Sequence, residues 1–129
     1  MASIFTKIIN GDILCHKILE DDRYLAFLDI NPIRPGHTLA ITKREIDYIF
    51  DLEDNLLSGL MLFSKEVGIA IKKATRCQRV GVVVAGYEVP HTHVHLIPTN
   101  GMSDFSFALA QQADQAELTV MVTKIQEHL

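Results

Sequence analysis

The chain has 129 residues and a formal net charge of -4, and 48% of its residues are hydrophobic while 22% are charged. This length fits a single domain over residues 1–129, and the composition is that of an ordinary soluble globular protein rather than a disordered one. The net negative charge argues against binding of nucleic-acid strands, although a single nucleotide needs only local complementarity.

The cysteines and the N-terminal residues indicate where the protein works. Cys15 and Cys77 lack both metal-site spacing and a secretory context, so we expect reduced thiols. Lys7, Asn10 and Asp12 interrupt the first apolar segment, which therefore does not resemble a signal peptide, and no apolar run approaches the length of a membrane span. We expect a cytoplasmic protein without membrane contact.

The first part of the chain predicts a short helix and three strands. Apolar residues recur at helical spacing from Ile4 to Ile9, and Gly11 follows them. Two β-rich segments flank a polar turn and predict a hairpin, and a connector with two prolines leads into a third strand. The expected strands cover residues 16–20, 24–30 and 38–42.

A long amphipathic helix is expected over about residues 52–74. Asp51 and Asp54 are three residues apart and resemble a capping pair before it. Gly59 and Gly68 each weaken a helix by about 1 kcal/mol relative to Ala, which indicates close packing against a neighbour. The apolar stripe expected to face the sheet is Leu52, Leu56, Leu60, Phe63, Val67, Ala70 and Ala74. The apolar surface is widened by Leu57, Met61, Leu62, Ile69 and Ile71. Either the rest of the protein covers this helix on several sides, or the extra surface is a subunit interface.

The last third predicts two more strands and a final helix. Residues 79–85 form a continuous apolar run that is typical of a sheet interior, and the next strand ends at Pro98. Beyond a loop over 99–107, Asp114 and Glu117 predict the cap of a helix that carries Leu118, Met121, Val122, Ile125 and Leu129. The expected fold is α+β: about five antiparallel strands, one long helix packed on them and shorter helices at the ends.

Three histidines, His91, His93 and His95, alternate along the strand before Pro98, so they are expected to share one face. Three inert rings on one face are disfavoured, because each would need a partner or water. A metal site is a second interpretation. At ~3.3 Å per residue, however, His91 and His95 are rooted ~13 Å apart, so one ion would bind at most a neighbouring pair.

The third interpretation of these histidines is nucleophilic catalysis. An imidazole with an unperturbed pKa of about 6.5 is mostly neutral and nucleophilic at cellular pH. Phosphorus is the electrophile that suits it, because a covalent intermediate divides one hard displacement into two easier ones. Neighbouring N–H donors then stabilise charge on the phosphoryl oxygens.

The sequence resembles the histidine triad (HIT) superfamily, and within it the Hint-like nucleoside-phosphate hydrolases. Residues 91–97, His-Thr-His-Val-His-Leu-Ile, match the signature His-x-His-x-His-x-x. Earlier segments match in the same order, at residues 4–13, 20–22, 25–32 and 35–39. The resemblance covers most of the chain up to Pro98.

This resemblance implies a hydrolase that uses no cofactor. His93 would attack the α-phosphorus of a nucleoside monophosphate moiety and expel an amine, an alcohol or a phosphate, and water would then cleave the nucleotidyl-histidine. His95 would donate to phosphoryl oxygens, His91 would assist near the leaving group, and His37 would support the cluster. The transferase branch has Gln where this chain has His95, which favours hydrolysis over nucleotidyl transfer.

The resemblance also implies a nucleotide pocket and a homodimer. Asp29 would accept hydrogen bonds from the ribose hydroxyls, although its spacing alone indicates a turn cap before Asn31. Ile30 would lie beside the sugar and a purine base. The dimer would form through the long helix and a neighbouring strand. Apolar residues expected at the nucleotide are Ile4, Phe5, Ile8, Phe27 and Leu39.

The chain departs from the Hint-like pattern in two places. Ser3 and Thr6 stand where many bacterial relatives carry a Cys-x-x-Cys zinc pair, so that half-site is missing. The loop before the triad is short and contains Glu88, where relatives have polar Asn and Ser contacts to the nucleotide, so the leaving group is left open. Two rival functions also remain: a nucleotide-binding regulatory module with little turnover, and a metalloenzyme that uses His93 with His91 or His95.

Overall fold

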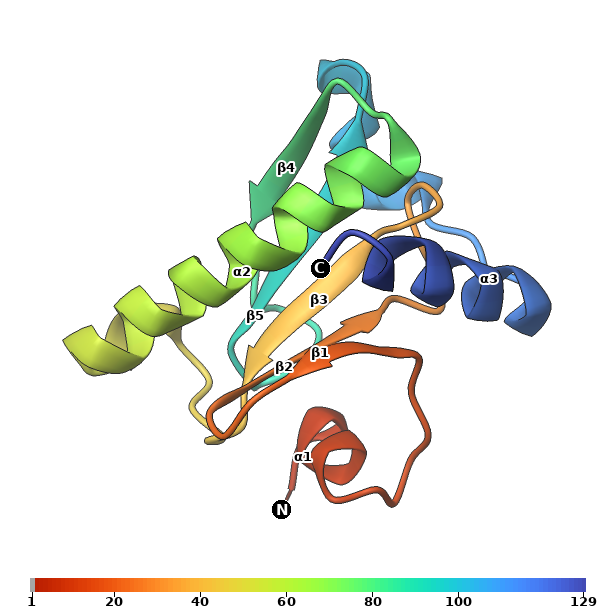
Figure 1. Cartoon of the computed structure of the whole chain (residues 1–129). Helices are drawn as coiled ribbons and strands as arrows, with labels where there is room; N and C mark the ends of the chain where they lie inside the picture. The colour runs from red at the N-terminus through yellow and green to blue at the C-terminus, as the bar shows by residue number, and fades with distance from the viewer. Residues whose placement is uncertain (1) are drawn as a thin grey trace.

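The computed structural model describes residues 2–129 as an antiparallel five-stranded sheet with three α-helices, which confirms the expected α+β class. The strand order is β1-β2-β3-β5-β4, so β5 lies inside the sheet and β4 lies at its edge. Figure 1 shows α2 lying across one face of this sheet. The elements are α1 Ile4–Ile9, β1 Lys17–Glu20, β2 Tyr24–Leu28, β3 Thr38–Thr42, α2 Asp54–Thr75, β4 Arg79–Val83, β5 His93–Thr99 and α3 Gln115–Gln126.

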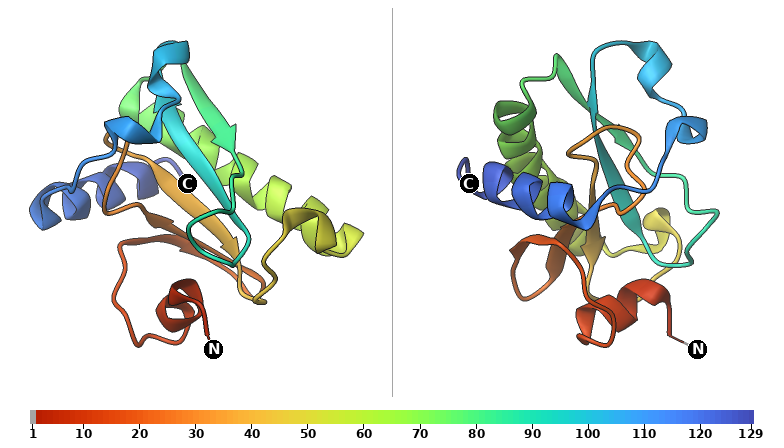
Figure 2. Two further views of the ribbon diagram at one scale, coloured as in Figure 1. Left: turned by 180° about the vertical axis from the view of Figure 1, so that it is seen from behind. Right: turned by 90° about the vertical axis from the view of Figure 1, so that its right-hand side faces the viewer.

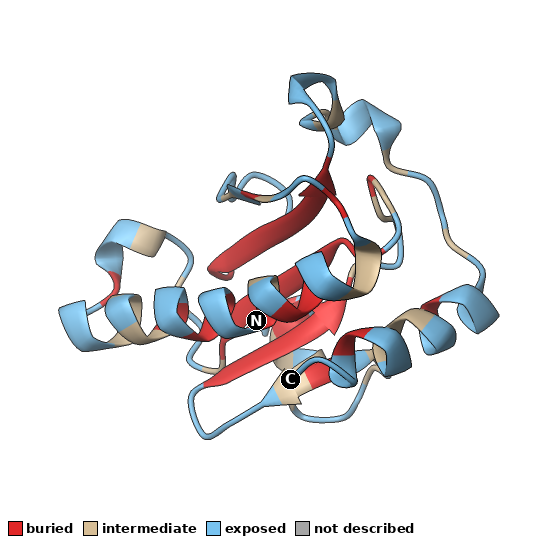
Figure 3. Ribbon diagram, turned by 45° about the horizontal axis from the view of Figure 1, so that its top comes forward, coloured by how far each residue is buried: buried red, intermediate tan, exposed pale blue. Residues whose placement is uncertain are grey.

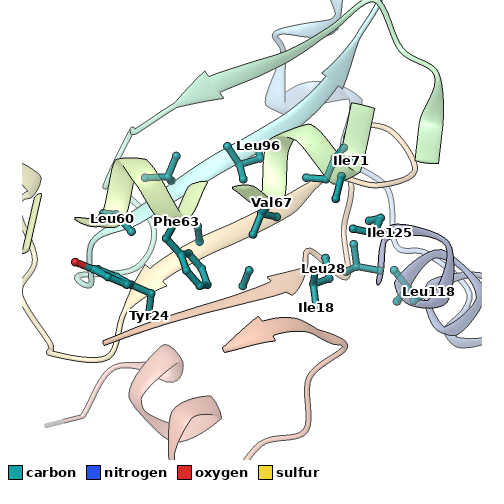
Figure 4. Close-up of a cluster of buried hydrophobic side chains, with 14 of the residues drawn as sticks. Ile18, Tyr24, Leu28, Leu60, Phe63, Val67, Ile71, Leu96, Leu118 and Ile125 are labelled. Carbon is teal, nitrogen blue, oxygen red and sulfur yellow. The ribbon is translucent and has the colours of Figure 1, made fainter. Parts of the chain in front are cut away.

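The main core lies between α2 and the sheet. Phe63, Val67 and Ile71 project from α2 onto strand residues such as Leu28 and Leu96 (Figure 4). Full burial of each such side chain stabilises the fold by roughly 1.5–3 kcal/mol. α3 closes one end of this core with Leu118 and Ile125, as its predicted apolar face requires. Figure 3 shows the buried strands beneath a helix whose outer side is exposed.

α1 covers the opposite face of the sheet. Phe5 is buried there against Leu25, Phe27, Leu39 and Ile41, which come from β2 and β3. Side chains alternate along a strand, so Leu39 and Ile41 face α1 while Ala40, between them, joins the core under α2. The views in Figure 2 show α1 and α2 on different sides of the sheet.

Several predicted strand boundaries were wrong. The second strand ends at Leu28, because Asp29 turns the chain and accepts a hydrogen bond from the Asn31 N–H. β5 begins at His93 and runs through Pro98, which pairs only with β4. The fourth strand ends at Val83.

Helix caps give a second comparison with the sequence. Asp51 does not cap α2. It ends the 3-10 turn Ile49–Asp51, and Glu53 is the N-cap residue, without a side-chain hydrogen bond. Asp114 caps α3 as predicted, since its side chain accepts from the Ala116 N–H. The predicted loop after β5 contains the 3-10 turn Met102–Asp104, and a second such turn, Phe107–Leu109, follows.

Gly59 has a packing role that explains its place inside a helix. The hydroxyl of Tyr24 donates to the Leu56 carbonyl at 2.9 Å, and the tyrosine lies where a side chain at Gly59 would project. At Gly68, by contrast, an added Cβ would meet nothing closer than Val80 at 3.9 Å. None of the helices within residues 2–129 is long and apolar enough to cross a membrane.

These two glycines give a matched test of the packing. Gly59→Ala should lower the free energy of unfolding by about 2 kcal/mol, because the new methyl group collides with Tyr24. Gly68→Ala should raise it by up to about 1 kcal/mol through better helix propensity. Urea unfolding at one fixed protein concentration measures both, and equal effects of the two substitutions would contradict the assignment.

Candidate active site

Four histidines meet on the α1 side of the sheet. β5 carries His93 opposite Ile41 and His95 opposite Leu39. His37 stands immediately before β3, and His91 lies two residues before β5. All four side chains are buried.

The ring of His93 has a defined tautomer. Its Nδ1 lies 2.6 Å from the carbonyl oxygen of His91. A carbonyl oxygen only accepts, so the proton of the neutral ring is on Nδ1 and this N–H donates. The lone pair is therefore on Nε2, as a nucleophile needs.

His37 and His95 form a second directional pair. The Ile33 N–H donates to Nδ1 of His37 at 3.0 Å, so the neutral His37 carries its proton on Nε2. That N–H donates to Nδ1 of His95 at 2.9 Å. The proton of the neutral His95 is consequently on Nε2, which leaves this N–H as a donor for a ligand.

Burial keeps this pair neutral. Desolvation, followed by the influence of His95, lowers the pKa of His37 from 6.5 to about 3. Desolvation and then His93 lower the pKa of His95 from 6.5 to about 4. At neutral pH both rings are uncharged, so the tautomers set by the hydrogen bonds persist.

Both ring nitrogens of His91 are hydrogen-bonded within the protein. Its ring is fully buried, with Nε2 donating to the Thr42 carbonyl at 2.6 Å and Nδ1 lying 2.7 Å from Oγ of Ser3. Burial also lowers the pKa of its ring. Both nitrogens thus have partners within the protein, and the assistance of His91 near a leaving group stays a prediction.

The sequence left two roles open for Asp29, a turn cap and an acceptor for the ribose hydroxyls, and its position in the structure is compatible with both. Its Oδ1 caps the turn by accepting from Asn31, while its Oδ2 lies 3.7 Å from Nε2 of His37. Partial burial raises the pKa of this carboxyl, and the Glu88 carboxylate adds to the rise. The second oxygen therefore lies at the histidine cluster with room to accept a further hydrogen bond.

A cavity of about 170 Å³ opens onto the histidines of β5. His93, His95, Glu88 and Phe107 line it, together with Ala85, Gly86 and Tyr87. Pockets that enclose a whole ligand measure roughly 300–1,000 Å³, so this space fits only part of a nucleotide. A larger cavity, of about 470 Å³, lies beneath α3 and touches Asp29 and His37 but neither His93 nor His95.

The apolar residues expected around a base divide into two groups. Phe5, Phe27 and Leu39 are buried together, and Ile8 packs against them. The Phe5 ring meets the His93 ring edge-on, with centroids 5.0 Å apart. Ile4 and Ile30 are about half exposed, at 48% and 49%. The first group forms an apolar wall beside His93, and the second offers uncovered apolar surface.

The HIT domain model matches residues 10–102, which is well over half of the chain. The chain belongs to the HIT family. An uncharacterized HIT-like protein of Borreliella burgdorferi is 37% identical over 111 residues, or 81% of this chain and 80% of the relative. An adenylylsulfatase of Arabidopsis thaliana is 34% identical over 100 residues, or 74% of this chain and 51% of the relative.

Solved HIT structures agree with this assignment. A hypothetical histidine triad nucleotide-binding protein from Sulfolobus tokodaii matches with a TM-score of 0.86 at 27% identity, over 96% of this chain and 89% of that one. The predicted family is therefore confirmed by both sequence and fold.

Two residues at or near the site of this HIT domain were not predicted from the sequence. Phe107 reaches it from beyond β5, with its ring centroid 4.9 Å from that of His95. The other is Glu45, which accepts hydrogen bonds from the N-terminal segment. Neither residue belongs to a recognisable motif, so no local signal marks them.

The group of potential metal ligands in the structure differs from the one named in the rival metalloenzyme interpretation. Asp29, His37 and His95 offer ligand atoms within 4.8 Å of one another, whereas His93 is not in this group. Nε2 of His37 and Nδ1 of His95 already bond to each other, so an ion would have to replace that bond. Among the described residues, this group therefore contains two histidine rings that are hydrogen-bonded to each other.

The low pKa values of His37 and His95 predict acid sensitivity of the fold. In the unfolded chain these rings bind protons below about pH 6.5, whereas the folded rings stay neutral down to about pH 4 or below. Stability is therefore complete above about pH 6.5 and falls as the pH drops toward 4, by about 1 kcal/mol per histidine between pH 6 and 5. Urea unfolding across this range measures the slope.

His95→Gln supplies the control, because glutamine does not titrate and its amide oxygen still accepts from His37. The slope of the unfolding free energy against pH should decrease by the contribution of one histidine. An unchanged slope would show that His95 titrates normally in the folded protein.

Proposed function

We propose that this chain is a nucleotide-binding hydrolase that cleaves the bond between the α-phosphate of a nucleoside monophosphate moiety and its leaving group. The observation that carries the proposal is the hydrogen bond from His93 Nδ1–H to the His91 carbonyl, because it leaves a nucleophilic lone pair on Nε2. Membership of the HIT family supports it, as does the similarity to an adenylylsulfatase of Arabidopsis and to a nucleotide-binding protein of Sulfolobus.

The reaction proceeds in two displacements. Nε2 of His93 attacks the α-phosphorus as the bond to the leaving group breaks, and the leaving group departs with the bond electrons and takes up a proton from solvent. The ring becomes positively charged, and the His91 carbonyl stabilises this charge through Nδ1–H. Water then attacks the phosphorus and breaks the P–N bond. The nucleoside monophosphate leaves, His93 regains its lone pair, and the water gives up its proton to solvent, which balances the proton taken up by the leaving group.

His95 stabilises the charge that develops on the phosphoryl oxygens. His95 lines the same cavity as His93, and His37 keeps the proton of the His95 ring on Nε2 by donating to Nδ1. A neutral N–H donor at fixed distance stabilises an oxyanion without rearrangement during the reaction. No metal is required by this scheme.

The nucleoside portion binds between apolar and acidic groups. A purine base lies against the wall of Phe5, Phe27 and Leu39, with Ile4, Ile8 and Ile30 completing its apolar contacts. Oδ2 of Asp29 accepts the ribose hydroxyls, since Oδ1 is occupied by the turn. A carboxylate suits this contact because it accepts several hydrogen bonds.

The leaving group is best neutral or cationic. Glu88 lines the cavity beside His93 and His95, and none of the described residues lining that cavity is Lys or Arg. A polyphosphate leaving group would bring several negative charges next to this carboxylate, whereas an amine would be attracted to it. We therefore favour phosphoramidates over dinucleoside polyphosphates.

A homodimer is part of the same proposal. β4 is an edge strand, and Val82 on it is 52% exposed. Beside it, Met61, Leu62 and Ile69 are exposed on α2. A second copy that covers this surface would hide both the apolar residues and the strand edge. The molar mass in solution, for the wild type and for Ile69→Glu, decides this point.

We also place the protein in the cytoplasm, where the free Cys15 and Cys77 stay reduced.

The decisive variant is His93→Ala. Its turnover should fall by more than about a thousandfold, because the nucleophile is gone, while its affinity for adenosine monophosphate should change little. Steady-state hydrolysis of an adenosine phosphoramidate, with chelator present, measures turnover, and calorimetry measures binding. His128→Ala, at an exposed histidine near the chain end, serves as the control.

Each alternative gives a different result in this assay. A His93→Ala protein as active as wild type would eliminate the proposed nucleophile. Tight nucleotide binding with no turnover in wild type would indicate a regulatory binding module, and loss of activity with chelator would indicate a metalloenzyme.

Glu88→Gln tests the leaving-group preference. Removing the negative charge should raise kcat/KM for diadenosine polyphosphates by about tenfold relative to the phosphoramidate, because the leaving phosphates are no longer repelled. The ratio of the two specificity constants, measured with wild type and variant, reports this effect. An unchanged ratio would show that Glu88 does not influence the choice of leaving group.

A further inference from the structure

The N-terminal segment is connected to the catalytic histidines by an unbroken set of hydrogen bonds. Oε1 of Glu45 accepts from the Ser3 backbone N–H and from Oγ1 of Thr6, both at 2.6 Å. Oγ of Ser3 in turn lies 2.7 Å from Nδ1 of His91. The set joins residues that are far apart in the sequence, so it forms only in the folded protein.

The direction of every bond in this set is fixed. His91 donates from Nε2 to the Thr42 carbonyl, so Nδ1 of the neutral ring is an acceptor and Ser3 must donate its hydroxyl proton. Oγ of Ser3 also accepts from the Thr6 N–H at 3.1 Å, as the N-cap of α1. Ser3 thus caps the helix and satisfies a buried nitrogen of His91.

This series of hydrogen bonds ends at His93, the proposed nucleophile. The ring of His91 has hydrogen bonds at both nitrogens, which hold its backbone, and the carbonyl oxygen of this residue accepts from Nδ1 of His93. Phe5, from α1, meets the His91 and His93 rings edge-on at centroid distances of 5.7 and 5.0 Å. Displacing α1 would therefore disturb the ring that carries the lone pair.

Glu45 is the anchor of this arrangement although it is exposed. The two short bonds from Thr6 and Ser3 lower the pKa of its carboxyl to about 2, which keeps it ionised at working pH. It follows β3 closely, as Thr42 ends that strand. The segment after β3 therefore holds the network from two sides, through the Thr42 carbonyl and the Glu45 carboxylate.

We propose that Ser3, Thr6 and Glu45 are positioning residues that hold His91 so that its carbonyl keeps the proton of His93 on Nδ1 and the lone pair on Nε2. This inference rests on the proposed function of His93. The three residues do not touch substrate. They act through His91, whose carbonyl selects the reactive tautomer.

The test uses two measurements on the full chain. Imidazole ¹⁵N NMR of ¹⁵N-histidine protein identifies which nitrogen of His93 is protonated, and steady-state kinetics on an adenosine phosphoramidate gives kcat and KM. Ser3→Ala and Glu45→Ala should shift His93 toward protonation on Nε2 and lower kcat about tenfold, with KM changed less than about twofold. Thr6→Val removes one donor and should have a smaller effect in the same direction.

Two controls separate positioning from general damage. Glu45→Gln keeps an acceptor oxygen for both donors and should restore kcat and the His93 signal close to wild type. Glu127→Ala removes an exposed glutamate at the C-terminal end of α3 and should change neither measurement. If Ser3→Ala does not fold, the Glu45 and Thr6 variants test the same link with the Ser3 hydroxyl intact.

The outcomes distinguish this inference from the proposed function. Unchanged His93 signals in folded Ser3→Ala and Glu45→Ala overturn the positioning role, even if kcat falls. If wild type hydrolyses nothing, the proposed function fails, while a His93 signal that moves in the variants still supports the positioning role.

Discussion

The alternation of side chains along β5 makes one strand serve both the core and the chemistry. Val94 and Leu96 point toward α2 and belong to the main core, whereas His93 and His95 point toward the opposite face. Because β5 is paired on both sides, by β3 and β4, its backbone has little freedom to move. The core beneath α2 therefore holds the histidines in place, and a shift of one residue in register would exchange the two sets.

Placing histidines on a buried face has an electrostatic consequence. Neutral imidazole has one donor and one acceptor, so each ring needs partners of defined direction. Backbone groups supply them: the Thr42 and His91 carbonyls accept, and the Ile33 N–H donates. Burial lowers the pKa of His37 and His95 and keeps them uncharged, so that their tautomers follow from these partners. The backbone around His93 thus determines that its lone pair lies on Nε2.

Local sequence patterns predicted the features that depend on local geometry. Alternation placed His93 and His95 on one face, and the side chain of Asp114 caps α3 as its position indicated. Features that depend on distant contacts were not predictable. β5 starts late because the segment before it bonds elsewhere, with Thr92 N–H donating to the Ile46 carbonyl. Glu45 and Phe107 reach the site through the tertiary fold, and spacing in the sequence says nothing about them.

The charges around the histidines limit which substrates are compatible with this site. In the proposed function a nucleotide brings negative charge to a region that already contains the Asp29 and Glu88 carboxylates. Burial, and to a lesser extent the charge of Glu88, raises the pKa of Asp29. The described residues lining the small cavity include no Lys or Arg, so in the proposed reaction the phosphoryl oxygens would be stabilised by neutral N–H donors. They do not compensate the further charges of a polyphosphate, and the same carboxylate that repels those charges attracts a protonated amine.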